Sequence, residues 1–246
     1  MNLLTNEFYF TASDATPWRD MSLSRLVTLI IDTATLHANE LGVGFARLKE
    51  NNSSWVLSRL AVDLPGGFPM VNRPYRLLTW VTSLNRMFSE RLFELVDDTD
   101  GTTIGWAHTT WMAIDLDTRR PADLSVLTEL SDVINPRPFG GEKPGKLIPL
   151  KGEMELCQNY TFRVSDIDIN RHVTTRRYVD MITDLWPLDH YMTSRVVRFE
   201  IAFKHEARYG DTATTSAVCD SDGAWLMETS VDGTVCNLAK IQFTNR

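Results

Sequence analysis

The feature that most constrains the fold is a repeat of the chain within itself. Residues 10–32 and 162–184 align at a constant offset of 152 positions without a gap. Seven of the 23 aligned pairs are identical, where average composition would give about one or two matches. These pairs are Phe10/Phe162, Ser13/Ser165, Asp14/Asp166, Arg25/Arg177, Val27/Val179, Ile30/Ile182 and Asp32/Asp184. Such a repeat predicts two copies of one structural unit.

Each copy predicts the same order of elements. Apolar and polar residues alternate over about residues 8–12 and 160–164, which indicates half-buried strands. After a polar turn, helical periodicity covers residues 23–41 and 174–186, with Gly42 and Pro187 as stop signals. Strand-like segments follow each helix, near 54–63, 75–84, 90–98 and 103–116, and near 195–205, 212–220, 224–231 and 234–244.

A helix followed by an antiparallel meander has one compact arrangement, in which the sheet curls around the helix and buries its apolar face. Residues 131–152 hold four prolines and four glycines, a composition typical of a linker. The sequence therefore predicts an α+β chain, with an N-terminal domain at 1–130, this linker, and a C-terminal domain at 153–246. Two such units can place their sheets edge to edge.

Composition narrows the classes of function. The formal net charge is −7, which argues against general nucleic-acid binding. No stretch approaches the roughly 18–20 apolar residues of a membrane helix, and the first ten residues do not resemble a signal peptide. Cys157, Cys219 and Cys236 match no zinc or redox spacing, so we expect free and largely buried thiols in a reducing cytoplasm. We expect no metal and no cofactor.

The two copies differ in the turn before the helix. The second copy has Asp168, Asn170 and His172, whereas the first copy has other residues at the aligned positions, Thr16, Trp18 and Asp20. Backbone amides at a helix start are unpaired and can stabilise an oxyanion, to which the Asn170 amide could also donate. Asp168 could orient His172 or activate water. Asp and Asn are also common turn formers, so the trio alone leaves both readings open.

This trio, followed by Val173 and Tyr178, resembles the signature of acyl-acyl-carrier-protein thioesterases, which are tandem hot-dog proteins of plants and bacteria. The family places a glutamate 34 residues after the histidine, and Glu206 stands there in this sequence. Residues 55–65 also resemble the family's first-domain strand, with Trp55 and Arg59 in place. The resemblance spans essentially the whole chain.

The resemblance implies two tandem hot-dog domains, each an antiparallel sheet wrapped around a long helix. It implies a cytoplasmic enzyme that hydrolyses fatty acyl-acyl-carrier protein to free fatty acid and carrier thiol, which ends fatty acid synthesis. The catalytic residues are expected only in the second domain, namely Asp168, Asn170, His172 and Glu206. The first domain is expected to be a non-catalytic copy that binds the acyl chain.

Two departures from the family pattern matter. A cysteine follows the glutamate in the plant enzymes, but Ala207 stands here, so a cysteine mechanism is excluded at that position. Glu206 or Asp168 must then activate water or attack directly, with His172 polarising or transferring a proton. The usual Asn-Asn pair after His-Val is Thr174-Thr175, either of which could cap the helix. The sequence shows no plant transit peptide, which indicates a bacterial protein.

Substrate contacts are expected in both copies. We expect Trp55, Arg59 and His37 near the acyl chain, with further tunnel aromatics that could equally be core residues, Trp80, Phe88 and Trp111. Docking of an acidic carrier protein by an acidic enzyme requires a local basic patch. The candidates nearest the turn are Arg171, Arg176 and Arg177, and those around the glutamate are Arg195, Arg198, Lys204 and Arg208.

The remaining histidines are interpreted as structural. His108, His190 and His205 are expected in strands or loops, and adjacent strand side chains such as His205 and Glu206 point to opposite faces. Three rivals stay open: an acyl-CoA thioesterase on the same fold, a non-catalytic acyl-binding sensor, and a hot-dog dehydratase, which the spacing does not support. The sequence leaves monomer and homodimer open.

Overall fold

A computed structural model describes residues 2–124 and 132–246. The chain divides into two compact units. The first comprises Met1–Ser22 and Leu29–Pro144, and the second comprises Leu23–Thr28 and Gly145–Arg246. No helix among the described residues is long and apolar enough to cross a membrane.

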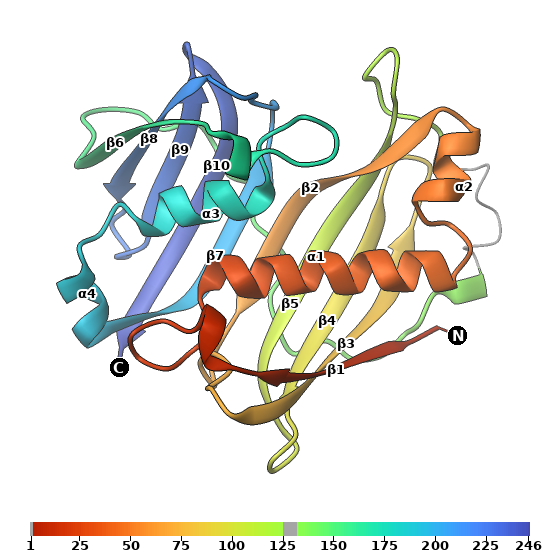
Figure 1. The fold of residues 1–246 in the computed structure, drawn as a ribbon, viewed down its shortest axis with the longest axis horizontal. Coiled ribbons are helices and arrows are strands. Elements are labelled where there is room, and N and C mark those ends of the chain that lie inside the picture. The colour runs from red at the N-terminus through yellow and green to blue at the C-terminus, as the bar shows by residue number, and fades with distance from the viewer. Residues whose placement is uncertain (1, 125–131) are drawn as a thin grey trace. The chain divides into compact units, whose positions relative to one another are not determined.

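The first unit is an antiparallel sheet whose face is crossed by a long helix, α1 (Figure 1), although the start of this helix, Leu23–Thr28, belongs to the second unit. Its strands pair in the order β1-β3-β4-β5-β2. In chain order the elements are β1 (Leu4–Phe10), α1 (Leu23–Glu40), α2 (Phe45–Glu50), β2 (Ser53–Asp63), β3 (Arg73–Leu84), β4 (Ser89–Asp97) and β5 (Thr102–Asp115).

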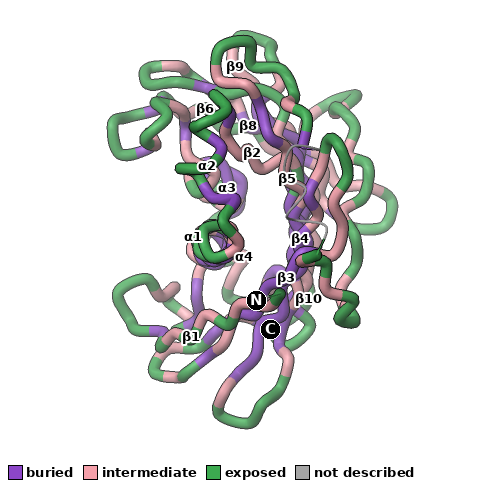
Figure 2. Tube along the Cα trace, turned by 90° about the vertical axis from the view of Figure 1, so that its right-hand side faces the viewer, coloured by how far each residue is buried: buried purple, intermediate pink, exposed green. Residues whose placement is uncertain are grey.

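Helix α1 forms because its apolar residues recur every three or four positions. Leu26, Ile30 and Ala34 are buried on one face, and His37 continues this buried face one turn later. Strand β4 is buried along most of its length, and so is the middle of β3, from Leu77 to Val81. Figure 2 shows buried residues running along the strands while the loops are exposed. The core of this unit therefore lies between helix and sheet.

The second unit repeats this plan with a shorter helix. Its strands pair antiparallel in the order β7-β10-β9-β8-β6. Helix α3 buries Tyr178, Val179, Met181 and Ile182. In chain order the elements are β6 (Leu156–Thr161), α3 (Thr175–Thr183), α4 (Leu188–Thr193), β7 (Ser194–Phe203), β8 (Thr212–Cys219), β9 (Trp225–Val231) and β10 (Thr234–Asn245).

The predicted strands are all present, but three of them end earlier than predicted. The first strand of each copy ends early, at Phe10 and Thr161, because the chain then turns into a short 3-10 helix. Ala12 and Val164, which the alternation places in these strands, are therefore exposed turn residues. Strand β7 ends at Phe203 rather than 205.

The helices differ more from prediction. The helix predicted over 174–186 ends at Thr183, and the short helices α2 and α4 were not expected. Pro187 does more than stop α3, because it stands at the N-terminal cap of α4, where a missing N–H costs nothing. His190 consequently lies in a helix, not in a strand or loop.

Candidate active site

Residues 168–172 form a tight turn just before α3. The Asp168 N–H donates to the His172 carbonyl (2.8 Å), and the Arg171 N–H donates to the Asp168 carbonyl (3.0 Å). Arg171 adopts a left-handed backbone (φ 65°) to close the turn. Asp168 Oδ1 accepts hydrogen bonds from the N–H groups of Asn170 (2.8 Å) and His172 (3.1 Å). Asp168 is therefore a turn former in this structure.

The segment after β7 brings Glu206 to this turn. The Val173 N–H donates to the Ala207 carbonyl (2.9 Å) and joins the two segments. His172 Nε2 and Glu206 Oε2 lie 3.2 Å apart. The His172 side chain is 18% exposed and that of Glu206 is 42% exposed. A solvent-accessible carboxylate thus contacts a half-buried imidazole, the arrangement that general acid–base chemistry requires.

Glu206 does not lie on a strand. Residues 204–207 follow the end of β7 in an irregular segment, and both His205 and Glu206 are exposed. The expectation that strand geometry separates these two side chains is therefore wrong. The N–H groups of Lys204 and His205 both donate to the Cys236 carbonyl (2.8 and 3.2 Å), which anchors the segment to β10.

The start of α3 supplies further donors beside the turn. Thr174 is the N-cap, and its hydroxyl oxygen accepts from the Arg177 N–H (3.2 Å). His172 lies two residues before this cap. The Asn170 side-chain amide is exposed and makes one long contact, 3.5 Å, with Asp168 Oδ2. The Arg177 N–H is thus occupied by the cap, whereas the exposed Asn170 amide is available to an oxygen that gains negative charge.

A buried ion pair fixes the turn to the helix. Arg177 Nε donates to Asp166 Oδ1 at 2.6 Å, and its guanidinium also lies over the Tyr160 ring. Burial alone would raise the pKa of Asp166, but hydrogen bonds from the Arg163 N–H, Arg177 and Tyr160 outweigh burial and lower it. Arg177, which was predicted to contact substrate, is thus paired with Asp166 within the protein.

The first unit contains the same turn without the same chemistry. The Thr16 N–H donates to the Asp20 carbonyl (2.8 Å) and the Arg19 N–H donates to the Thr16 carbonyl (2.9 Å), with Arg19 left-handed (φ 66°). The Met21 N–H donates to the Pro69 carbonyl (2.8 Å), as the Val173 N–H does to Ala207.

The matching hydrogen bonds locate the counterpart of Glu206 in the first unit. Since Pro69 corresponds to Ala207, Phe68 corresponds to Glu206. The alignment of the two copies therefore passes from an offset of 152 at the turn to 138 here, and the sequence repeat alone does not reveal this pair. We call Asp168, Asn170, His172 and Glu206 the polar quartet. Their positions in the first copy are occupied by Thr16, Trp18, Asp20 and Phe68.

The predicted acyl-binding residues lie in the first unit, each in a distinct setting. The Trp55 indole N–H donates to the Val43 carbonyl (2.8 Å) and packs against a core cluster that includes Val43 and Leu48. Arg59 is exposed at a β-bulge in β2. His37 is buried, with its Nδ1 2.5 Å from the guanidinium of Arg91.

Sequence reasoning missed Arg91. This arginine is buried in β4, where desolvation lowers its pKa to about 10. The available signal was the alternation of the strand, which places Arg91 on the same face as Phe93 and Leu95.

The other predicted cations are placed on the second unit. Arg171 is exposed at the turn, and Arg176 is exposed on α3, 3.9 Å from Asp180. Arg198 pairs with Glu200 on β7 (2.9 Å). All three cysteines are free thiols, but only Cys236 is buried, and the expectation of burial is wrong for Cys157, which is exposed. Within residues 2–124 and 132–246, no cluster of three His, Cys, Asp or Glu side chains is arranged to hold a metal ion.

An antiparallel sheet wrapped over a helix, present twice in one chain, defines the tandem hot-dog class that the sequence predicts. Models of the acyl-ACP thioesterase N-terminal and C-terminal domains match residues 3–134 and 151–245. The chain therefore belongs to the acyl-ACP thioesterase family, which confirms the predicted family and fold class.

Solved structures agree with this assignment. An acyl-ACP thioesterase from Bacteroides thetaiotaomicron is 32% identical, with a TM-score of 0.91 over 99% of this chain and 98% of that one. The 12:0-ACP thioesterase from Umbellularia californica shares the fold, with a TM-score of 0.90 at 16% identity, over 100% of this chain and 98% of that one.

Curated plant relatives are more distant. The palmitoyl-acyl carrier protein thioesterase of Gossypium hirsutum is 24% identical over 75% of this chain and 47% of its own length. An oleoyl-acyl carrier protein thioesterase of Arabidopsis thaliana is 22% identical over 82% of this chain and 61% of its own length. The chain thus spans about half to three-fifths of these relatives.

Proposed function

We propose that this protein hydrolyses fatty acyl-acyl-carrier-protein thioesters to a free fatty acid and a carrier thiol. The observation that carries the proposal is the contact of His172 with Glu206, 3.2 Å apart, beside the exposed amide of Asn170. These groups meet in a chain whose family is named for this reaction. The proposed site residues remain Asp168, Asn170, His172 and Glu206, with Asp168 in a positioning role.

The geometry favours Glu206 over Asp168 as the base. Asp168 Oδ1 already accepts two backbone hydrogen bonds inside the turn, whereas the Glu206 side chain is 42% exposed and reachable by water. In the proposed step Glu206 takes a proton from water as the water oxygen bonds to the thioester carbon. Direct attack by Glu206, through an anhydride, is the alternative.

Neighbouring groups then stabilise the developing oxyanion and protonate the leaving group. The Asn170 amide and backbone N–H groups in the first turn of α3 are the proposed donors to the oxygen that gains negative charge. When the carbon–sulfur bond breaks, His172 or protonated Glu206 returns the proton to the departing thiolate, so the pair ends in its starting state. Asp168 contributes by holding the turn.

The proposal includes a division of labour between the two domains. Residues 153–246 carry catalysis, residues 131–152 link the domains, and residues 1–130 bind the acyl chain without catalysis. Support comes from the apolar Phe68 at the position of Glu206, which leaves the first copy without a comparable base. The acyl carrier protein is the proposed donor, in the cytoplasm, with the enzyme a monomer or homodimer.

Thiol release from acyl-carrier substrates of several chain lengths tests the proposal, with the wild type and His172→Ala compared at matched circular dichroism. The wild type is expected to release thiol, and the variant to release it at least about 100-fold more slowly. No release by a folded wild type would favour a non-catalytic acyl-binding protein. Faster hydrolysis of acyl-CoA than of acyl-carrier protein would overturn the proposed donor.

A further inference from the structure

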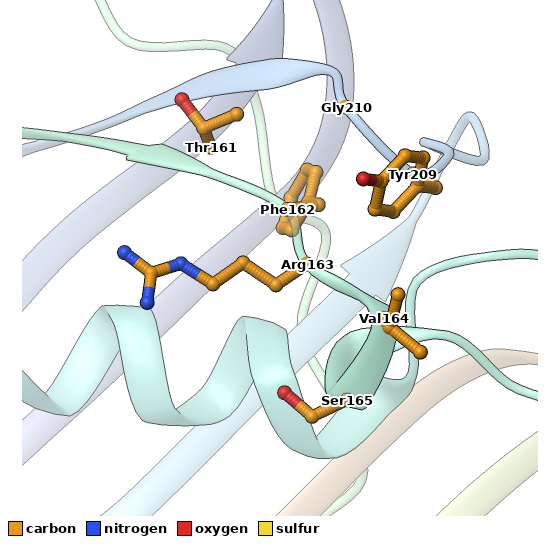
Figure 3. A pocket seen from close by; sticks show the side chains of 7 residues that line it. All are labelled: Thr161, Phe162, Arg163, Val164, Ser165, Tyr209 and Gly210. Atoms are coloured by element: carbon orange, nitrogen blue, oxygen red, sulfur yellow. The ribbon is translucent and has the colours of Figure 1, made fainter.

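Two segments of the second unit, residues 161–171 and 204–210, form one continuous surface. At one end the Val173 N–H meets the Ala207 carbonyl beside the His172–Glu206 pair. At the other end the Gly210 N–H donates to the Phe162 carbonyl (3.0 Å). A shallow groove opens at that second end, and its lining is shown in Figure 3: Thr161, Phe162, Arg163, Val164, Ser165, Tyr209 and Gly210.

Large apolar side chains are exposed along this surface. Val164 is 77% exposed, Ile169 is 88% exposed and Tyr209 is 65% exposed. Figure 3 shows Val164 and Tyr209 projecting from the two segments at the same end of the groove. The corresponding residues of the first copy are Ala12, Pro17 and Val71. Clustered apolar exposure of this kind is typical of a surface that a partner covers.

Cations lie on the same two segments. Arg163, Arg171, Lys204 and Arg208 are exposed, and none forms an ion pair with any residue that the structure describes. The corresponding residues of the first copy are Thr11, Arg19, Gly66 and Met70, so three of the four cations occur only beside the polar quartet. Within these two fully described segments, Glu206 is the one exposed acid.

We infer that this surface docks the acidic protein that carries the acyl group, an inference that rests on the proposed function. The docking rim is defined as Arg163, Val164, Ile169, Arg171, Lys204, Arg208 and Tyr209. The occupant follows from charge: a chain with net charge −7 presents here four cations without ion pairs on the segments that carry the exposed apolar side chains, which complements an acidic partner that also has an apolar face. A carrier seated on the rim has its thioester arm beside His172 and Glu206.

The test compares one acyl group on two donors, the acyl carrier protein and a short pantetheine thioester. The variants are Arg163→Glu/Arg208→Glu and Val164→Ser/Tyr209→Ser, none of which alters the proposed catalytic residues. Matched controls in the first unit are the exposed Lys49→Glu and Met87→Ser. Binding of the acyl-carrier protein is measured separately by titration calorimetry, at low and high salt.

Both rim variants are expected to raise KM for the carrier substrate about tenfold or more, with the charge-reversal effect shrinking at high salt. Hydrolysis of the pantetheine thioester and both controls are expected to stay near wild type. Equal losses on both donors, or unchanged carrier KM in both variants, would overturn the docking rim. If the wild type binds carrier but hydrolyses neither donor, the proposed hydrolysis fails. In that case the docking proposal is retained only if the rim variants bind the carrier protein more weakly than the wild type does.

Discussion

The two carboxylates of the site differ in what occupies their oxygens. Asp168 Oδ1 accepts from two backbone N–H groups, and Oδ2 receives only the long contact from Asn170. Glu206 contacts His172 from an exposed position after β7. Replacing a carboxylate by an amide has a different effect in each role. An amide oxygen still accepts hydrogen bonds and can hold a turn, but an amide is not a base and cannot take a proton.

Glu206→Gln and Asp168→Asn should therefore differ in their effect on kcat. Glu206→Gln is expected to lower kcat at least about 100-fold with little change in melting temperature. Asp168→Asn keeps an oxygen for the two N–H groups and should cost less than about tenfold in kcat, whereas Asp168→Ala should cost more. Steady-state kinetics and thermal melts check this. A loss from Asp168→Asn as large as that from Glu206→Gln would assign proton transfer to Asp168.

At the scale of elements, the strands follow from the sequence more closely than the helices do. Alternating apolar residues bounded by turns place β8, Thr212–Cys219, within one residue of its predicted end. The predicted end of α3 is wrong because the helical spacing of apolar residues continues in the sequence beyond the last helical residue. Trp186 is buried although it is not helical, so burial alone does not distinguish a helix from a packed loop.

Helix α3 offers a direct test of its cap. Thr174 accepts a hydrogen bond from the Arg177 N–H, while Thr175 is the first helical residue. Thr174→Ala is expected to lower the free energy of unfolding by about 1 kcal/mol, and Thr174→Asn to restore most of it, since Asn also caps helices well. Urea unfolding measures the difference, with Thr175→Ala as the control. Equal losses at both positions would show that the cap hydrogen bond is not the cause.

The ion pair between Asp166 and Arg177 predicts a pH dependence. The folded pKa of Asp166 lies below its ordinary value of 3.8, so its carboxylate stabilises the fold above that value, and the contribution is lost as pH falls toward the lowered pKa. Asp166→Asn should cost about 2 kcal/mol at pH 7, and the gap to wild type should narrow below about pH 4.

Urea unfolding between pH 3 and pH 7 measures this gap. Asp189→Asn, on the exposed first turn of α4, controls for the change in net charge. A gap that stays constant on acidification, or that widens, would contradict the assigned role of Asp166.

At the scale of the whole molecule, the two compact units are not two separate stretches of sequence. Leu23–Thr28, the start of α1, belong to the second unit together with Gly145–Arg246. Leu23, Leu26 and Val27 in that stretch are buried. Residues 145–246 expressed alone should therefore unfold at a lower urea concentration than the intact chain, since each buried aliphatic side chain contributes about 2 kcal/mol. An unchanged midpoint would show that the stretch is dispensable.

The site was predictable only in part. The difference between the repeated turns points to Asp168, Asn170 and His172, because one copy carries polar groups that the other lacks. Glu206 was reached through the family spacing alone, since the repeat changes offset between the turn and the segment after β7. The division of roles between Asp168 and Glu206 depends on which backbone amides each one meets, and this information is tertiary.

The agreement between the two turns has a consequence for redesign. Thr16 accepts the Trp18 N–H (3.2 Å) just as Asp168 accepts that of Asn170 (2.8 Å), so an oxygen at the first position suits this backbone in either copy. The shape is then independent of whether chemistry is present. Reactive side chains could therefore be introduced by substitution at positions 16, 18, 20 and 68 without a change in the backbone conformation.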